Sequence, residues 1–294
     1  MSKRRVIPGF GLTMGFTIAY LGLIILLPLA ALFLRAAGVG WAEWWTLLSS
    51  PRVMAATELT FGLSAAAGAL SVILGLLVTW VLVRYEFPGK SLLDAMVDLP
   101  FALPTAVAGI TLTQIYGKDG WIGSQIAATA SWLKDTWHPG GWLGMQVDSW
   151  AEFGAAYSPL GIFIALTFIG LPFVVRTLQP VMEDLGSEIE EAAATLGAGR
   201  WTVFRRVILP LLMPALITGF TLAFARAIGE YGSVIFISGN LPMKTEILPL
   251  LIVSQLEQFK YGAAAVISAG MLAVSFMLLL IINLLQRKLN WQHR

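Results

Sequence analysis

The feature that most constrains this chain is a series of long apolar runs. Six of them occur, at residues 9–34, 59–83, 92–116, 158–175, 211–228 and 263–285. A transmembrane helix needs about 20 largely apolar residues. The first run is longer than the apolar region of a signal peptide, which has about 7–15 residues, so we expect it to be retained. The sequence therefore predicts an all-α integral membrane protein with six transmembrane helices.

Composition agrees with a membrane protein and excludes several other classes. Only 12% of the 294 residues are charged, against about 25% in soluble domains. The net charge of +2 leaves no basic surface for a nucleic acid. Cysteine is absent, and the two histidines, His138 and His293, are too far apart for a metal cluster. We therefore expect no nucleic-acid partner, no metal site and a membrane-lipid environment.

The basic residues in the loops predict the orientation, because cytoplasmic loops carry the excess of lysine and arginine. With the N-terminus in the cytoplasm, twelve basic residues lie inside, namely Lys3, Arg4, Arg5, Arg84, Lys90, Arg176, Arg200, Arg205, Arg206, Arg287, Lys288 and Arg294. Six lie outside, namely Arg35, Arg52, Lys118, Lys134, Lys244 and Lys260, and Arg226 falls within a span. This bias predicts that both termini are cytoplasmic.

The outer loops are rich in tryptophan. Trp41, Trp44 and Trp45 follow the first run, and five more tryptophans fall in residues 117–157. Tryptophan collects at membrane interfaces because its ring is apolar and its N–H is polar. We favour helices lying on the outer membrane surface over a stacking site for a sugar or a base.

Enzyme motifs are missing or incomplete. Gly89, Lys90 and Ser91 resemble the end of a phosphate-binding P-loop, but Arg84 stands where the motif needs its first glycine. No His-Asp, Ser-Lys or paired-carboxylate set lies in the spans, so a membrane-embedded enzyme is disfavoured. If nucleotide energy is used, another chain must bind the nucleotide.

The cytoplasmic loop at residues 183–210 carries the most informative pattern. Ile189, Ala192, Ala193 and Leu196 recur at helical spacing. Gly197 is placed to end this helix in a left-handed cap. A second apolar edge follows, and Pro210 suits the first turn of the fifth span. The pattern predicts a helix–turn–helix elbow across the cytoplasmic mouth. An amphipathic loop resting on lipid headgroups is the alternative.

This loop resembles the signature loop of ABC-importer permeases, with Val207 in place of the usual isoleucine. Residues 5–10, 98–109, 172–181, 229–240 and 244–246 resemble the T-type membrane subunit of bacterial sulfate/thiosulfate importers. The resemblance covers nearly the whole chain, except for a longer outer loop at residues 117–157. The W-type sulfate subunit and the molybdate permease share the elbow, but the proline-rich segment 98–109 favours the T-type subunit.

The resemblance implies a type I ABC-importer permease fold in the bacterial inner membrane. Its implied regions are an N-terminal helix with an outer amphipathic loop (1–56), a permease core (57–286) and a cytoplasmic tail (287–294). The implied partners are a W-type permease subunit, two ATPase subunits that bind ATP and Mg, and a periplasmic sulfate-binding protein. This chain itself would need no cofactor and would not be catalytic. A self-contained secondary transporter would have no reason to carry the elbow.

The resemblance also assigns residues and leaves two questions open. It implies that the elbow couples to the ATPase through Glu190, Glu191, Ala192, Ala193, Gly197, Leu209 and Pro210. Molybdate, tungstate or another tetrahedral oxyanion remains the alternative substrate. Whether the partner permease is a separate gene product or a second copy is also open.

Arg226 and Glu230 are the charged residues expected deepest in the membrane. They stand at i and i+4 near the outer end of the fifth span, and ionisable residues at membrane depth are functional candidates. Arg226 is the only basic residue clearly inside a span, so it is a candidate for the path of an anion. A structural ion pair with Glu230 explains the pattern equally well, and both interpretations stay open.

Two prolines, Pro100 and Pro104, are expected to interrupt the third span just before Thr105. A broken helix offers free N–H groups that could receive an anion, so these three residues join the candidate path. The small residues that follow favour a kink for packing instead. Asp94 and Asp98 would repel an anion, and we expect them at the cytoplasmic rim.

Overall fold

The computed structural model describes residues 10–137, 140–186 and 188–291. Within these ranges the chain is helical throughout its regular structure, and its only strand-type pairing is an isolated bridge between Gly117 and Gly154. The elements in order are α1 (Phe10–Leu21), η1 (Gly22–Leu26), α2 (Leu27–Ala37), α3 (Trp41–Leu48), α4 (Pro51–Arg84), α5 (Lys90–Val97), α6 (Leu99–Ala102), α7 (Thr105–Tyr116), α8 (Gly123–Trp137), α9 (Gly141–Phe153), α10 (Pro159–Asp184), α11 (Glu188–Thr195), α12 (Arg200–Val203), η2 (Phe204–Ile208), α13 (Leu209–Ile228), α14 (Val234–Ser238), α15 (Leu248–Glu257) and α16 (Tyr261–Trp291).

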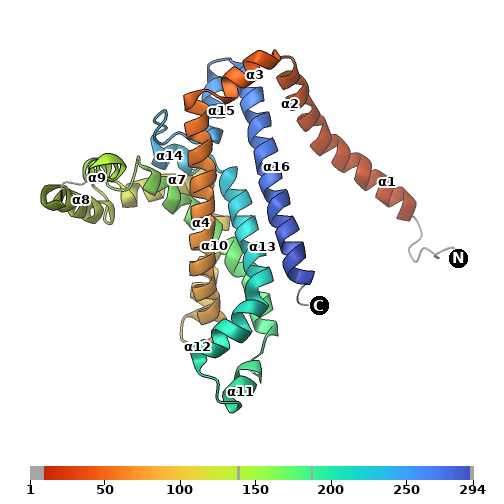
Figure 1. Ribbon diagram of the computed structural model, residues 1–294, viewed down its shortest axis with the longest axis vertical. Helices are drawn as coiled ribbons and strands as arrows, with labels where there is room; N and C mark the ends of the chain where they lie inside the picture. Colours follow the sequence, from red (N-terminus) through yellow and green to blue (C-terminus); the bar gives the residue numbers. More distant parts are fainter. Residues whose placement is uncertain (1–9, 138–139, 187, 292–294) are drawn as a thin grey trace.

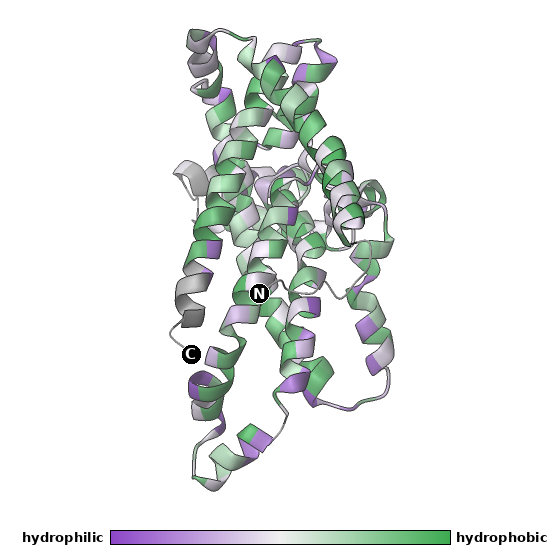
Figure 2. Ribbon diagram, turned by 90° about the vertical axis from the view of Figure 1, so that its right-hand side faces the viewer, coloured by the Kyte–Doolittle hydropathy of each residue, from purple (hydrophilic) through white to green (hydrophobic). Residues whose placement is uncertain are grey.

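Five helices in the described residues are long and apolar enough to cross a membrane: Phe10–Ala37, Pro51–Arg84, Pro159–Asp184, Arg200–Ile228 and Tyr261–Leu284. They correspond to five of the six predicted spans. In Figure 1, α2, α4 and α16 all have one end near α3, whereas α11 lies at the opposite end of the molecule. Figure 2 shows apolar residues along most of the long helices and polar residues gathered around α11.

The third predicted span is not one continuous helix. Residues 92–116 instead divide among α5, α6 and α7. Leu103 and Pro104 adopt extended ψ angles of 133° and 132° between α6 and α7. Leu103 is driven out of the helical region because it precedes a proline. The break predicted at Pro104 is therefore confirmed, while Pro100 lies within the first turn of α6.

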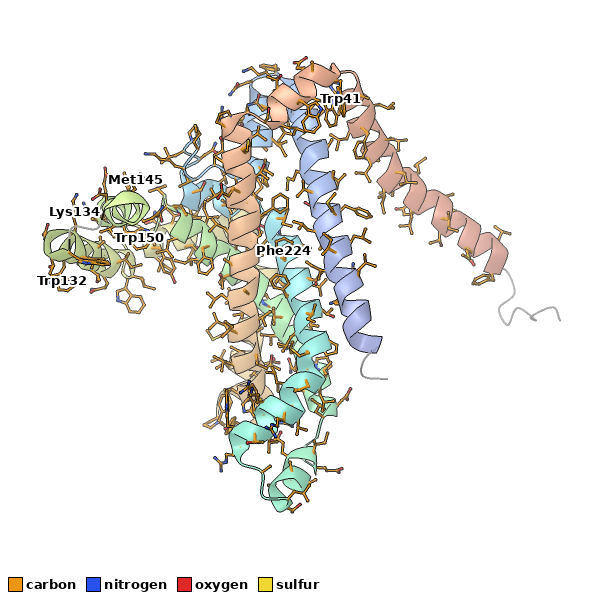
Figure 3. The ribbon with its side chains drawn as sticks, in the orientation of Figure 1. Trp41, Trp132, Lys134, Met145, Trp150 and Phe224 are labelled. Carbon is orange, nitrogen blue, oxygen red and sulfur yellow. The ribbon has the colours of Figure 1, made fainter. Side chains whose placement is uncertain are left out.

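Three helices, α4, α10 and α13, form the centre of the protein. One face of α4 is made of small buried residues, namely Thr60, Ser64, Ala67, Gly68, Ser71, Gly75 and Thr79. A Cβ added to Gly75 would lie 2.6 Å from Val174 Cγ1 of α10, and one added to Gly68 would lie 3.1 Å from the Phe220 ring and 3.7 Å from Phe224 Cβ of α13. Phe224 is labelled in Figure 3. Small residues let helix backbones approach closely in membranes, so this face fixes how the three helices pack.

Pro210 lies in the first turn of α13, as predicted, but the fifth span begins earlier than expected. The helix is continuous from Arg200 to Ile228, and the π-helical turn η2 ends two residues before Pro210. The same arrangement occurs in the first span, where η1 ends two residues before Pro28. A proline inside a helix lacks the N–H and crowds the preceding turn, and a wider turn accommodates it. The fifth span ends at Ile228, with Gly229 as its C-cap.

The first and last helices extend away from the centre. No residue in the most apolar stretch of the helix Phe10–Ala37 is buried within the protein. Figure 1 shows α1 diverging from α16. α16 continues to Trp291, so residues 287–291 of the predicted tail are helical. The apolar side chains of α1 therefore face the surroundings of this subunit.

The long outer loop, residues 117–157, forms a helical hairpin. The Ala155 and Ala156 N–H groups both donate to the Tyr116 carbonyl, at 2.9 and 3.2 Å, which holds the two ends of the loop together. Lys134 of α8 pairs with Asp148 of α9 at 2.8 Å, and this hydrogen bond raises the pKa of Lys134. Figure 1 shows the hairpin projecting sideways from the bundle.

Candidate coupling elbow and translocation path

The elbow is a short helix, α11, that ends in a complete Schellman motif. The Ala198 N–H donates to the Ala193 carbonyl at 3.1 Å, and the Gly197 N–H donates to the Ala194 carbonyl at 2.9 Å. Gly197 has a backbone φ of +79°, which residues other than glycine rarely adopt. The predicted left-handed cap at Gly197 is therefore confirmed, and it turns the chain from α11 toward α12.

The two faces of α11 differ in their surroundings. Ala193 and Ala198 pack against a buried cluster that includes Met182, Val203 and Ile208. On the other face, Glu191 and Ala192 are exposed, and Leu196 is 88% exposed. Of the predicted coupling residues, Ala193 therefore faces the protein itself, whereas Glu191 and Ala192 face outward.

An ion pair ties the elbow to the end of α4. Arg84 Nη2 lies 2.8 Å from Glu190 Oε1, and it also donates to the Gly186 carbonyl at 3.4 Å. The Arg84 guanidinium lies over the Trp80 ring, 5.9 Å from its centroid, and Trp80 contacts Phe204 edge to face. The elbow is thus held on both sides, through Glu190 to α4 and through its apolar face to η2.

Leu209 and Pro210 lie behind the elbow rather than on its surface. Both side chains are half-buried, and Leu209 packs against the same buried cluster as Ala193. On the outward side of this segment, Trp201 is 71% exposed. Leu209 therefore supports the elbow from within, and Trp201 adds to its outer surface.

Arg226 and Glu230 form the predicted ion pair. Arg226 Nη1 lies 2.5 Å from Glu230 Oε2, with the Arg226 side chain 34% exposed and Glu230 buried. Glu230 Oε1 also accepts hydrogen bonds from the Ser233 N–H and hydroxyl, at 2.9 and 3.0 Å. Glu230 therefore braces the end of the fifth span against the turn that follows. The part-exposed guanidinium keeps N–H groups available for another acceptor.

The break in the third span meets the end of the fifth. A Cβ added to Gly232 would lie 2.2 Å from Thr105 Oγ1 and 3.4 Å from the Ala106 N atom. Thr105 and Pro104 at the start of α7 are therefore brought beside the Glu230–Ser233 turn. Gly232 therefore packs directly against the start of α7. Pro100 belongs to α6, in the segment bound by Arg176.

Arg176 binds the first part of the broken span, a contact that the sequence did not reveal. Its Nε and Nη2 atoms donate to the two carboxylate oxygens of Asp98, at 2.8 and 2.6 Å. Its Nη1 atom donates to Asp94 at 2.7 Å and to Gln179 at 2.6 Å, and Nη2 also donates to the Asp94 carbonyl at 3.0 Å. The one sequence signal for this contact was the spacing of Asp94 and Asp98, which places two carboxylates one helical turn apart where a single cation can bind both.

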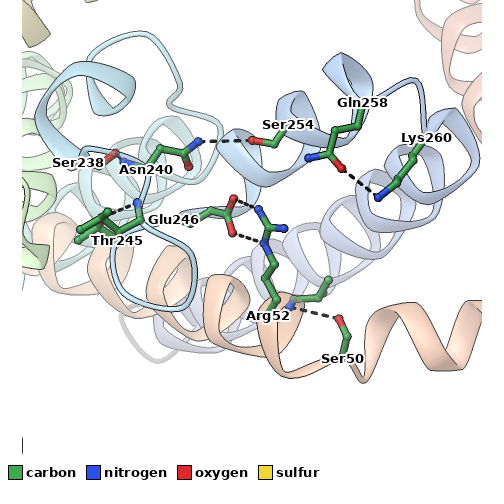
Figure 4. A network of polar contacts seen from close by, with 11 residues as sticks. Ser50, Arg52, Ser238, Asn240, Thr245, Glu246, Ser254, Gln258 and Lys260 are labelled. Carbon is green, nitrogen blue, oxygen red and sulfur yellow. Dashed lines mark hydrogen bonds and ion pairs between the residues drawn. The ribbon is translucent and has the colours of Figure 1, made fainter.

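A second long-range ion pair joins the opposite end of α4 to the loop before α15 (Figure 4). Arg52 donates to both carboxylate oxygens of Glu246, each at 2.7 Å. Glu246 is buried, and Thr245 Oγ1 beside it accepts from the Leu241 N–H at 3.0 Å. These contacts give a structural role to residues 244–246, which the sequence singled out only by resemblance.

A metal site in a protein is built from a set of donor side chains that lie close together. Within residues 10–137, 140–186 and 188–291, no group of three or more His, Cys, Asp or Glu side chains is placed to hold a metal ion. The features that do stand out are an exposed elbow at one end and a broken span that meets a buried ion pair.

Comparisons with known proteins agree on one family. Residues 71–291 match the family described as binding-protein-dependent transport system inner membrane component. The chain is 45% identical to the sulfate transport system permease protein CysT of Escherichia coli K12, over 98% of this chain and 96% of that protein. It is 48% identical to the protein of the same name from Synechocystis, over 92% of this chain and 87% of that protein.

Two solved structures share the fold. Both are crystal structures of a bacterial ABC transporter for alginate, one of them in complex with a periplasmic protein that holds an alginate pentasaccharide. The TM-scores are 0.68 and 0.70, at 17% and 15% identity, over 94% and 95% of this chain and 93% and 96% of those chains. The chain is a multi-pass inner-membrane protein and belongs to the family of binding-protein-dependent transport system inner membrane components.

Proposed function

We propose that this chain is the membrane-spanning subunit of an ATP-driven importer of sulfate and thiosulfate. The observation that carries the proposal is its 45% identity, over 98% of its length, to a sulfate transport permease. In this proposal the chain forms half of the translocation path, and a W-type permease subunit forms the other half. A periplasmic sulfate-binding protein delivers the anion.

The same proposal assigns energy coupling to the elbow. Two ATPase subunits bind ATP and Mg and carry out the hydrolysis, and this chain has no catalytic role of its own. The exposed face of α11, with Glu191, Ala192 and Leu196, seats in a cleft of one ATPase. Because Glu190 is paired with Arg84, movement of the elbow is passed directly to α4.

The path of the anion runs past the meeting point of the third and fifth spans. Arg226 supplies the positive charge that a divalent anion needs within the membrane. Its ion pair with Glu230 fixes the position of the guanidinium, and its partial exposure supports contact with a passing anion. Thr105 lies beside Gly232 in the same region, and Pro104 directly precedes it in the chain.

Uptake of labelled sulfate tests this function. A strain that lacks its own sulfate permease subunit is supplied with this chain and its partner subunits, and uptake is measured with and without the sulfate-binding protein. We expect uptake that requires the binding protein and that excess thiosulfate reduces. Uptake of molybdate in place of sulfate would support the alternative substrate. Sulfate uptake that is the same with and without the binding protein would contradict the proposal.

A further inference from the structure

A groove of about 410 Å³ lies between α4 and α16, and Leu48 at the end of α3 forms part of its lining. Its walls are almost entirely apolar and include Leu48, Phe61, Ile267, Met271 and Val274. Two polar residues, Thr57 and Glu58, line it on the α4 side. Met54 and Val274 at the groove are 59% and 40% exposed, so the groove is open toward the surroundings of the subunit.

Glu58 is an exposed carboxylate at the edge of this apolar groove, and like other exposed carboxylates of the described residues, such as Glu43 and Glu257, it has no cation within the subunit. The carboxylates of Glu246 and Glu230, elsewhere in the same half of the protein, are each paired with an arginine. Glu58 makes neither an ion pair nor a side-chain hydrogen bond with any other residue in the described part of the chain. A carboxylate at the edge of an apolar groove is stabilised there by a positively charged group.

The position of Glu58 along α4 indicates its depth. Residues 59–83 contain no charged residue, and they extend roughly 37 Å as a helix, against about 30 Å for the hydrocarbon core. Glu58 therefore stands at the level of the lipid headgroups, in the leaflet that contains α3. From there the groove runs inward, because Phe61 lies further along α4 and Val274 further along α16.

We propose that this groove binds a phospholipid whose headgroup carries a primary ammonium, such as phosphatidylethanolamine. The ammonium pairs with Glu58 and donates hydrogen bonds to it, and an acyl chain lies along the apolar walls toward Val274. A choline headgroup has no N–H to donate, and a headgroup with net negative charge is repelled by Glu58. Glu58 thus selects the headgroup, and the apolar walls hold the acyl chain.

Lipid retention tests the proposal. The transporter complex is placed in nanodiscs with equal parts of phosphatidylethanolamine, phosphatidylcholine and phosphatidylglycerol, extracted briefly, and analysed for retained lipid by mass spectrometry. We expect phosphatidylethanolamine to be enriched by about two- to five-fold, the factor that one exposed charge pair supplies. Glu58→Gln should abolish the enrichment. Glu43→Gln, which removes an exposed carboxylate of α3 outside the groove, should leave it unchanged.

Two further variants separate the lipid from other occupants. Met271→Trp fills the groove and should reduce retention of every lipid there, while Glu58→Gln changes only the headgroup preference. Equal enrichment in wild type and Glu58→Gln would overturn the proposal. So would efficient cross-linking of a photoreactive probe at Met54→Cys to the second permease subunit, because a protein segment would then occupy the groove.

Discussion

Arg84, at the last residue of α4, lies 2.8 Å from Glu190 of the elbow helix α11. The pair joins the end of the longest helix to a helix of only eight residues. The two side chains are partly buried, at 16% and 32% exposure, so solvent screens the pair less than it would a fully exposed one. The elbow is therefore held to a membrane-spanning helix as well as to the chain on either side of it.

The cap of the elbow gives the first prediction. Gly197→Val should leave the protein in the membrane but abolish stimulation of ATP hydrolysis by the binding protein, because valine at φ of +79° costs about 1–3 kcal/mol. Gly199→Val is the matched control, since a Cβ at either glycine meets nothing within 4 Å and Gly199 has an ordinary φ of −68°. Equal ATPase stimulation in both variants would contradict a coupling role for the elbow.

The buried ion pair gives the second prediction. Arg226→Ala leaves Glu230 buried without its cation, and breaking such a pair costs about 3–5 kcal/mol, so the yield of assembled complex should fall. The double variant Arg226→Ala with Glu230→Gln removes the charge but keeps an acceptor for Ser233. We expect it to restore the yield without restoring sulfate uptake. Recovery of both would show that the pair is only structural.

The contacts of Arg176 give the third prediction. Arg176→Lys keeps the charge but loses the planar group that binds Asp94 and Asp98 together. We expect a loss of about 1–3 kcal/mol of stability, reduced by partial exposure, seen as a lower melting temperature of the complex in detergent. Arg205→Lys on the exposed part of η2 should change little. Equal melting temperatures would show that these contacts do not stabilise the complex.

The close packing of α4 gives the fourth prediction. Gly75→Leu should destabilise the protein by about 1–3 kcal/mol or more, because the new side chain collides with Val174. Gly62→Leu on the same helix meets nothing within 4 Å at its Cβ and should be tolerated. Membrane-inserted yield and thermal aggregation measure both, and similar losses would contradict the packing argument.

The orientation gives the fifth prediction. The absence of cysteine allows single cysteines to be labelled cleanly. Ser131→Cys in α8 should react with an impermeant maleimide in intact spheroplasts, whereas Thr195→Cys at the end of α11 should react only after lysis. The reverse pattern would place the elbow outside the cell and contradict both the predicted topology and the coupling role.

Local features were the most predictable from the sequence. The left-handed cap at Gly197, the break at Pro104 and the pairing of Arg226 with Glu230 each depend on residues within a few positions of one another. Local rules missed the start of the fifth span, because a proline in the first turn of α13 did not indicate the π-helical turn that continues the helix before it. Segment 92–116 was apolar enough for a span, but its prolines divide it into three pieces.

Long-range contacts were the least predictable. Arg176 and Asp98 are 78 residues apart, and Arg52 and Glu246 are 194 apart. Hydrophobic periodicity indicates which face of a helix is buried, but it does not indicate which polar groups meet across helices. The positive-inside count treated Arg52, Arg84 and Arg176 only as loop charges, although each forms a specific contact.

The length of α4 has a mechanical consequence. With 34 residues, the helix extends roughly 51 Å, and an arginine near each end is fastened to a different part of the chain, Arg52 to Glu246 and Arg84 to Glu190. Contact with α10 at Gly75 leaves little room for α4 to slide past its neighbour. If the elbow is displaced, α4 is therefore expected to tilt as one rigid helix. That tilt would move the loop before α15 on the other side of the membrane.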